Sequence, residues 1–496
     1  MTLQTLKFAG LALLGAASVT LASVPAIAAE VSQREIEALK AQIQALEKKL
    51  NLIQATQETR INEIKIKQDA VEVKLDNGRP LLRTSDGMFE MALRGRVHFD
   101  TGSYFQDDDN LPATAPGRDL SEGSNFRRAQ LGVEGKFMRD WEYKLEFNFG
   151  GSGTESGGVI KDAILSYTGF KPLKIEIGAM QPPMTMDDTT SSNETTFIEC
   201  GTAANLATSF AAGEGRSSVG VRGNTNNFYA SLYYTMGLVG EGGIDEQSAL
   251  VGRTAYRFAP NPDANIHIGA SASSVIEFNQ AVGGPVFTLQ DRPELRVDGT
   301  RLISTGSLGS ENALVYGPEL AGNWKNFYAQ GEYYRFQIDR PGAVSEADFD
   351  SWYVQASYIV TGEAKPYDMK NAVYSSPKPN GPFGFGSIGA VELAARYSAA
   401  DLNHNASRAA CAGAVAGGIA TLNPGAATDC VRGGEQDIVT LGVNWYPNRN
   451  VRFMLNYLLA DIDRRAYSNN AVANGGPNAQ IGQDYNAVAF RTQFNW

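Results

Sequence analysis

From residue 89 onward, most of the chain consists of segments in which apolar and polar residues alternate. The segment 89–100, FEMALRGRVHFD, places Phe89, Met91, Leu93, Val97 and Phe99 on one face and Glu90, Arg94, Arg96, His98 and Asp100 on the other. The segments 141–149 (WEYKLEFNF), 352–360 (WYVQASYIV) and 451–459 (VRFMLNYLL) repeat the pattern. Each is about ten residues long, with one apolar, partly aromatic face, which is typical of a strand between lipid and a polar interior.

The connections between these strands alternate in length. Short turns are expected at 138–141, 169–173, 223–227, 259–265, 322–326 and 446–450. Long polar loops are expected near 105–125, 150–158, 181–215, 237–248, 278–293, 340–348, 403–435 and 465–483. Short turns on one side and long loops on the other are the arrangement of outer-membrane barrels.

The number of strands follows from this alternation. If 294–304 and 312–322 form one interrupted strand, the chain has about sixteen strands and ends on the periplasmic side, as such barrels do. The segment 361–389 is long but falls on the short-turn side, so we interpret it as a periplasmic excursion.

The C-terminal segment, AVAFRTQFNW, supplies the last strand. Pairing it with the strand that begins at residue 89 would leave no free edge. Phe490, Phe494 and Trp496 would then face lipid and Arg491 the lumen. The sequence thus predicts an all-β, 16-stranded antiparallel transmembrane β-barrel over 88–496; a soluble sandwich is the less favoured alternative.

Two segments precede the barrel. Residues 1–28 contain Lys7, an apolar run and the small-residue site AIA, which is typical of a secretory signal peptide. Residues 30–75 repeat apolar residues at 3-4-3-4-3 spacing: Ile36, Leu39, Ile43, Leu46, Leu50 and Ile53. This narrow seam predicts an α-helical coiled coil between chains in the periplasm, and it leaves dimer and trimer open.

Composition excludes several function classes. The formal net charge is −11, and it becomes −12 without residues 1–28, which carry one base and no acid. An acidic chain argues against nucleic acid as a partner. The histidines His98, His267 and His404 show no metal-ligand spacing, and no cofactor motif or catalytic grouping stands out. The sequence therefore predicts neither an enzyme nor a resident metal or cofactor.

The chain has three cysteines. Cys411 and Cys430 lie in one loop, and in an oxidising compartment we expect them to form a disulfide. Closing a loop of about 20 residues stabilises a protein by roughly 3 kcal/mol in the chain-entropy model. Two free thiols are the alternative, and the state of Cys200 stays open.

Several stretches resemble the phosphate-selective porin O and P family. They are FRRAQLGVEGKFMRDWEYKLEFNF, DAILSYTGFKPLKIEIGAMQPPM, SSNETTFIE, RPELRVDGTRLISTG, VTGEAKPYD and GAVELAARYSAADLN, in the expected order within 88–496. The resemblance implies a homotrimer of 16-stranded barrels in a Gram-negative outer membrane, with a pore narrowed by the third long loop, 181–215. Passive transport of small inorganic anions such as phosphate is implied, with Trp496 as the assembly signal.

A pore selects through the charges that line it. Alternation assigns these bases to the lumen: Arg94, Arg96, Arg128, Lys136, Lys144, Lys174, Arg222, Arg253, Arg257, Arg396, Arg452 and Arg491. Guanidinium groups bind phosphate bidentately, so such a row suits an oxyanion path. Alternatively, these bases pair with the inward acids and merely solvate the lumen: Glu90, Asp100, Glu134, Glu142, Glu146, Asp162, Glu176 and Glu392.

The predicted constriction loop departs from the family. It contains no Lys or Arg, it has Asn193 where relatives often place a lysine, and it carries Asp187, Asp188, Glu194, Glu199 and Glu214. Unless these carboxylates point away from the pore, they disfavour anions. One alternative is a general or cation-preferring porin. Another is a non-conducting binding or adhesion barrel, held to peptidoglycan by 30–75 and plugged by 181–215 and 403–435.

Overall fold

The computed structural model describes residues 27–69, 71–76, 78–106, 119–151, 158–240, 247–278, 280–281, 284–342, 345–407, 429–465 and 480–496. It divides into an N-terminal unit that ends at residue 70 and a second unit that begins at residue 71. The predicted signal peptide lies outside the described residues except for its last two. No helix in the described part of the chain is both long and apolar enough to cross a bilayer.

The N-terminal unit contains one helix, α1 (Ile27–Asp69). The six seam residues from Ile36 to Ile53 are 49–63% exposed in the single chain. The helix is confirmed, while its coiled-coil pairing stays a prediction. Its expected end at residue 75 is wrong, because the chain changes to strand at Val71. Val71, Val73 and Leu75 alternate with polar residues, a strand period rather than a helical one.

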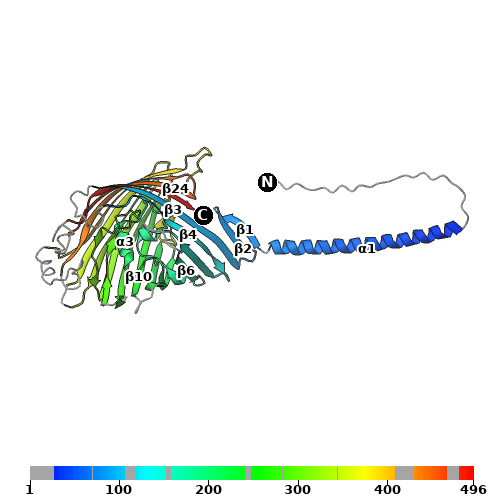
Figure 1. Ribbon diagram of the computed structural model, residues 1–496, viewed down its shortest axis with the longest axis horizontal. Coiled ribbons are helices and arrows are strands. Elements are labelled where there is room, and N and C mark those ends of the chain that lie inside the picture. The colour runs from blue at the N-terminus through cyan, green and yellow to red at the C-terminus, as the bar shows by residue number, and fades with distance from the viewer. Residues whose placement is uncertain are drawn as a thin grey trace. The chain divides into compact units, whose positions relative to one another are not determined.

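Within the described residues, sixteen antiparallel strands form a closed barrel (Figure 1), which confirms the predicted fold class. They are β3 (Phe89–Gln106), β4 (Gly123–Phe137), β5 (Trp141–Asn148), β6 (Val159–Tyr167), β7 (Leu173–Met180), β8 (Arg216–Asn224), β9 (Phe228–Leu238), β10 (Ser248–Asn261), β11 (Ala264–Glu277), β17 (Asn312–Trp324), β18 (Phe327–Asp339), β19 (Ala347–Ile359), β22 (Ala390–His404), β23 (Val431–Tyr446), β24 (Val451–Asp463) and β25 (Tyr485–Asn495).

The last strand closes the barrel on the first. β25 pairs with β3 from Tyr485↔Gln106 to Asn495↔Arg96. Phe490 and Phe494 are 41% and 45% exposed on the outer face, whereas Arg491 is fully buried inside. Below the end of β25, the hairpin of β1 (Val71–Asp76) and β2 (Arg79–Thr84) pairs with the start of β3. The two partners together cover most of one edge of β3, which would otherwise be free to pair with another chain.

The short and long connections fall on opposite sides, as predicted. The connections 138–140, 168–172, 225–227, 262–263, 325–326 and 447–450 are short, and the other side carries the long loops. The prediction for 294–304 is wrong, because this segment is not part of β17. Its alternating residues Leu295 and Val297 are buried against the inner-face residue Tyr104 instead of facing lipid.

Three connections fold into the barrel. Loop 181–215 carries α2 (Met186–Thr189) and α3 (Thr202–Ser209). Loop 278–311 carries β12 (Gln280–Ala281), β13 (Gly284–Phe287), β14 (Gln290–Asp291), β15 (Ile303–Ser304) and β16 (Leu308–Gly309). The segment 360–389 carries β20 (Tyr367–Asp368) and β21 (Val373–Tyr374). It leaves from the short-turn side, as expected, but it enters the lumen rather than extending away from it.

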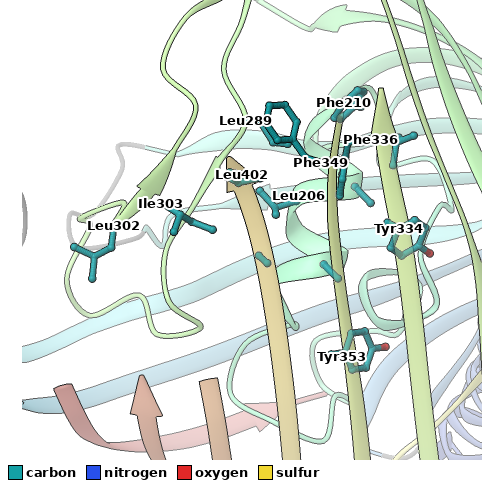
Figure 2. Packing of buried hydrophobic residues seen from close by; sticks show 14 of the residues in the cluster. Leu206, Phe210, Leu289, Leu302, Ile303, Tyr334, Phe336, Phe349, Tyr353 and Leu402 are labelled. Atoms are coloured by element: carbon teal, nitrogen blue, oxygen red, sulfur yellow. The ribbon is translucent and has the colours of Figure 1, made fainter. Parts of the chain in front are cut away.

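An apolar core joins these inserted segments to the barrel wall. Figure 2 shows Leu206 and Phe210 near Phe336 and Phe349, which belong to one buried cluster. Phe336 and Phe349 lie on the inner faces of β18 and β19, opposite the lipid-facing side. The inner wall is therefore apolar where α3 covers it and polar where it borders open space.

Candidate functional site

A cavity of about 500 Å³ lies between loop 181–215 and the inner faces of β3 to β9, and we call it the lumen cavity. Nine bases line it: Arg79, Arg94, Arg96, Arg128, Lys136, Lys144, Lys161, Lys174 and Arg222. Five carboxylates on the barrel side line it as well: Glu90, Glu134, Glu142, Asp162 and Glu176. Loop 181–215 contributes Asp188 and Glu214.

Most of these bases pair with carboxylates on neighbouring strands. The Arg94 guanidinium hydrogen-bonds Glu134 and lies 3.4 Å from Glu146. In a second pair, Lys144 Nζ lies 2.5 Å from Asp162. Lys174 and Arg222 share Glu176 at 2.9 and 3.1 Å, and Lys174 also reaches Glu142. These bases therefore form ion pairs with carboxylates of the barrel wall, which is the second of the two arrangements that the sequence left open.

Arg96 is different. Its guanidinium donates to the hydroxyls of Ser192 and Ser191 at 2.6 and 3.1 Å, both in loop 181–215. No carboxylate among the described residues lies within ion-pair distance of Arg96. Arg128, which also lines the cavity, has its nearest carboxylate, Glu199, at 3.8 Å. These two arginines carry the least compensated positive charge in the lumen cavity.

Two β-bulges bring additional bases inside. Between the pairs His98↔Arg128 and Phe99↔Phe126, Arg127 is an extra residue, and it turns inward to bind Glu199 at 2.8 Å. A second bulge makes Lys161 the extra residue next to Asp162, and both side chains face the lumen. A bulge places two successive residues opposite one, which interrupts the alternation of faces. Strict alternation therefore does not assign either base to the lumen.

Four of the predicted pore bases anchor the inserted segments instead of lining the lumen cavity. Arg396, Arg452 and Arg491 donate to the backbone carbonyls of Glu199, Thr195 and Ile198 in loop 181–215. Arg253 binds the carbonyls of Asn371 and Ala372, both at 2.7 Å, and pairs with Glu319.

Arg257 is the remaining predicted base that does not line the lumen cavity. It donates to Asn265 Oδ1 at 2.7 Å and lies over the Tyr367 ring.

The acids of loop 181–215 are largely turned away or compensated. Asp187 is buried and accepts the Gly201 N–H at 2.8 Å. Glu194 accepts the Ser376 N–H. Glu199 is fully enclosed and pairs with Arg127, Arg491 and Arg296. Asp188 lines the cavity, where it accepts a hydrogen bond from Gln181.

Asn193 joins the loop to the wall. Its side-chain oxygen lies 3.0 Å from His98 Nε2, and its carbonyl accepts from Arg452 and Gln493. The position is thus used for anchoring in this chain.

Two further bases were missed because their segments had been assigned elsewhere. Arg79, on β2, reaches Glu134 at the edge of the cavity. Arg296, on the inserted loop 278–311, pairs with Glu199. Both residues are plainly basic in the sequence. The alternation of apolar and polar residues, however, gives no indication that a hairpin before the barrel and an outer loop both reach the lumen.

The cysteines are only partly placed. Cys411 lies outside the described residues, so its disulfide with Cys430 stays a prediction. Cys200 is a free thiol that lines the lumen cavity.

Two known bacterial proteins resemble the chain in sequence over more than three quarters of its length. Porin O of Pseudomonas aeruginosa is 25% identical over 411 residues, which span 78% of this chain and 86% of that protein. An uncharacterized protein of Caulobacter vibrioides is 26% identical over 393 residues, 77% of this chain and 71% of that protein.

Two outer-membrane proteins of solved structure align with most of the chain. OmpT of Vibrio cholerae has a TM-score of 0.49 at 14% identity, covering 82% of this chain and 98% of that one. An anion-selective porin from Comamonas acidovorans has a TM-score of 0.47 at 14% identity, covering 82% and 100%. A sequence model of the phosphate-selective porin O and P family matches residues 91–496, and the chain therefore belongs to that family.

Proposed function

We propose that this chain is an outer-membrane porin through which small anions, phosphate among them, diffuse passively by way of the lumen cavity. The observation that carries the proposal is the excess of bases on the barrel side of the cavity. Arg96 adds to it, because it is held by two serine hydroxyls and by no carboxylate among the described residues. Family membership and the closed barrel support the porin and its location.

The chemistry of Arg96 suits transient anion binding. A guanidinium presents planar donors that match an oxyanion, and an anion can take them over from the Ser191 and Ser192 hydroxyls. Each exchange replaces a neutral acceptor by a charged one. Such contacts favour entry, and wall carboxylates next to Arg94 and Lys144 keep the binding weak enough for exit.

The acidic constriction loop is compatible with this proposal. Asp187, Glu194 and Glu199 bind backbone N–H groups or arginines, so they present little free negative charge to a passing anion. Asp188 and Glu214, which line the lumen cavity, are the exceptions, and they favour the second candidate, a general or cation-preferring porin. The three inserted segments favour the third candidate, a non-conducting binding barrel.

The test is the reversal potential of the purified protein in planar bilayers under a KCl gradient, with and without millimolar phosphate. We expect anion selectivity and a current reduced by phosphate. Arg96→Gln should weaken the phosphate block by about tenfold, as expected for losing a charged hydrogen bond of roughly 1.5 kcal/mol. Arg257→Gln, which removes an arginine outside the lumen cavity, should behave as wild type.

The other outcomes select between the candidates. Cation selectivity without a phosphate effect would support the second candidate and reject phosphate as substrate. A folded protein that inserts into the bilayer without conductance would support the binding barrel.

The assembly belongs to the same proposal. Residues 1–28 direct export and are removed, Trp496 serves as the assembly signal, and Cys411 and Cys430 form a disulfide. The exposed seam of α1 pairs with other copies as a periplasmic coiled coil, and the barrels associate as a homotrimer surrounded by lipid. The coiled coil also supplies a surface that could contact peptidoglycan.

A further inference from the structure

The two sides of the lumen cavity carry opposite charge. On the barrel side, nine bases face five lining carboxylates, and one more acid, Glu146, lies behind Arg94 and Lys161. On the side of loop 181–215, the charged lining residues are Asp188 and Glu214, and the loop contains no Lys or Arg. Glu214 lies 3.8 Å from Lys161 of the barrel side, whereas Asp188 has no such partner among the described residues. The barrel side is therefore net positive, and the loop side is net negative.

The negative side is held firmly in place. Thr185 caps α2 by accepting the Asp188 N–H at 3.1 Å. The Glu332 carboxylate on β18 accepts the N–H groups of Met186 and Asp187 at 2.6 and 3.0 Å. Asp188 itself accepts from Gln181, and no base among the described residues lies within ion-pair distance of it. Burial, with Glu214 and Asp187 nearby, raises the pKa of Asp188 to about 7, so about half of its negative charge is present at neutral pH and available to a solute in the cavity.

Opposed charges across a narrow space produce an electric field directed across the path of diffusion. Low-dielectric walls and limited water strengthen such a field. An anion is attracted by one side and repelled by the other, and a neutral polar solute gains little from either. A zwitterion is attracted at both ends, because its carboxylate and its ammonium group can face opposite sides.

We propose that the lumen cavity favours small zwitterionic solutes of the α-amino-acid class, with the carboxylate toward Arg96 and the ammonium group toward Asp188. This inference rests on the proposed porin function and extends its substrate class. The zwitterion has no net charge, so it crosses without disturbing the membrane potential. Attraction at both ends raises its concentration in the cavity and hence its flux, provided that binding stays weak.

The test is the swelling of liposomes that contain the full-length protein, in isotonic glycine or isotonic glycolamide. The two solutes have the same atoms and similar size, but glycine is a zwitterion and glycolamide is neutral. We expect wild type to swell about twofold faster in glycine, as modest attraction between partly screened charges would produce. Asp188→Asn should bring the ratio close to one, and Asp188→Glu should keep it.

Two controls make the result specific. Asp263→Asn removes the same charge in a short turn outside the lumen cavity and should leave the ratio unchanged. Glu214→Gln removes the other loop carboxylate and should also lower the ratio, which keeps the test valid if Asp188→Asn fails to fold.

The outcomes separate the two proposals. Equal rates for glycine and glycolamide in wild type, or the same ratio in wild type and in folded Asp188→Asn and Glu214→Gln, would overturn the zwitterion inference while the porin stands. No swelling in either solute would overturn the porin function and this inference together.

Discussion

At the scale of single residues, the pairing of the last strand with the first ends at Gly95 and Trp496. Each donates its backbone N–H to the carbonyl of the other, at 3.3 and 3.1 Å. A Cβ on Gly95 would lie 1.9 Å from the Trp496 ring. The last residue of the chain thus lies directly over a position of β3 that has no side chain, which explains why an aromatic residue can end the barrel there.

We expect Gly95→Ala to destabilise the folded barrel by about 1–3 kcal/mol, the usual cost of adding a methyl group where there is no room for it. Guanidinium unfolding in detergent micelles, followed by tryptophan fluorescence, measures the change. Gly252→Ala on β10 is the matched control, because the nearest heavy atom to its Cβ lies 3.6 Å away. Equal midpoints for the two variants would contradict the role of Gly95.

At the scale of elements, the alternation of apolar and polar residues predicted which face of each strand meets lipid and which meets the lumen. It placed Arg94 and Arg96 correctly because β3 keeps strict period two over this stretch. The same rule failed at Arg127 and Lys161, because each is the extra residue of a β-bulge and its side chain turns inward. The sequence held a signal, since each would otherwise have been a charged side chain facing lipid next to another charge.

The inserted segments were harder to predict because their conformation depends on distant partners. Leu295 and Val297 alternate as they would in a strand, yet their apolar face is covered inside the barrel. The segment 360–389 likewise gives no local signal that Asn371 and Ala372 will meet Arg253, more than a hundred positions earlier. Local periodicity specifies a strand and its faces, but the contents of the lumen follow from contacts between elements.

Arg253 allows a prediction about the inserted segment 360–389. Its buried side chain holds the carbonyls of Asn371 and Ala372 and pairs with Glu319. Arg253→Met leaves these groups uncompensated, at a cost of about 3–5 kcal/mol. We expect the segment to loosen, and single-channel recordings should show a larger and noisier conductance because Asn371 lines the lumen cavity.

Two comparisons check this expectation. Arg301→Met removes an exposed arginine and should conduct as wild type does. Arg253→Met combined with Glu319→Gln removes both charges and should recover part of the lost stability, because no unpaired buried charge remains. A quiet current of wild-type size from Arg253→Met would show that the segment is held by its other contacts alone.

At the scale of the whole molecule, the two units meet different needs. The barrel satisfies the hydrogen-bonding groups of its own backbone, because every strand of the closed sheet has a partner on each side. The helix α1 does not bury its seam within one chain, since the apolar residues from Ile36 to Ile53 remain about half exposed. A stripe this narrow is better suited to a coiled coil than to packing on a globular surface.

If α1 pairs between copies, changing the seam should weaken the assembly without unfolding the barrel. Ile43→Lys combined with Leu46→Lys places charge in the seam, and we expect thermal dissociation of the oligomer in detergent to shift to lower temperature. Light scattering follows the mass, and circular dichroism separates loss of helix from loss of sheet. Gln44→Lys is the control, because this residue lies between seam positions. An unchanged dissociation temperature for the double variant would mean that the barrels alone hold the oligomer and that α1 has a different partner.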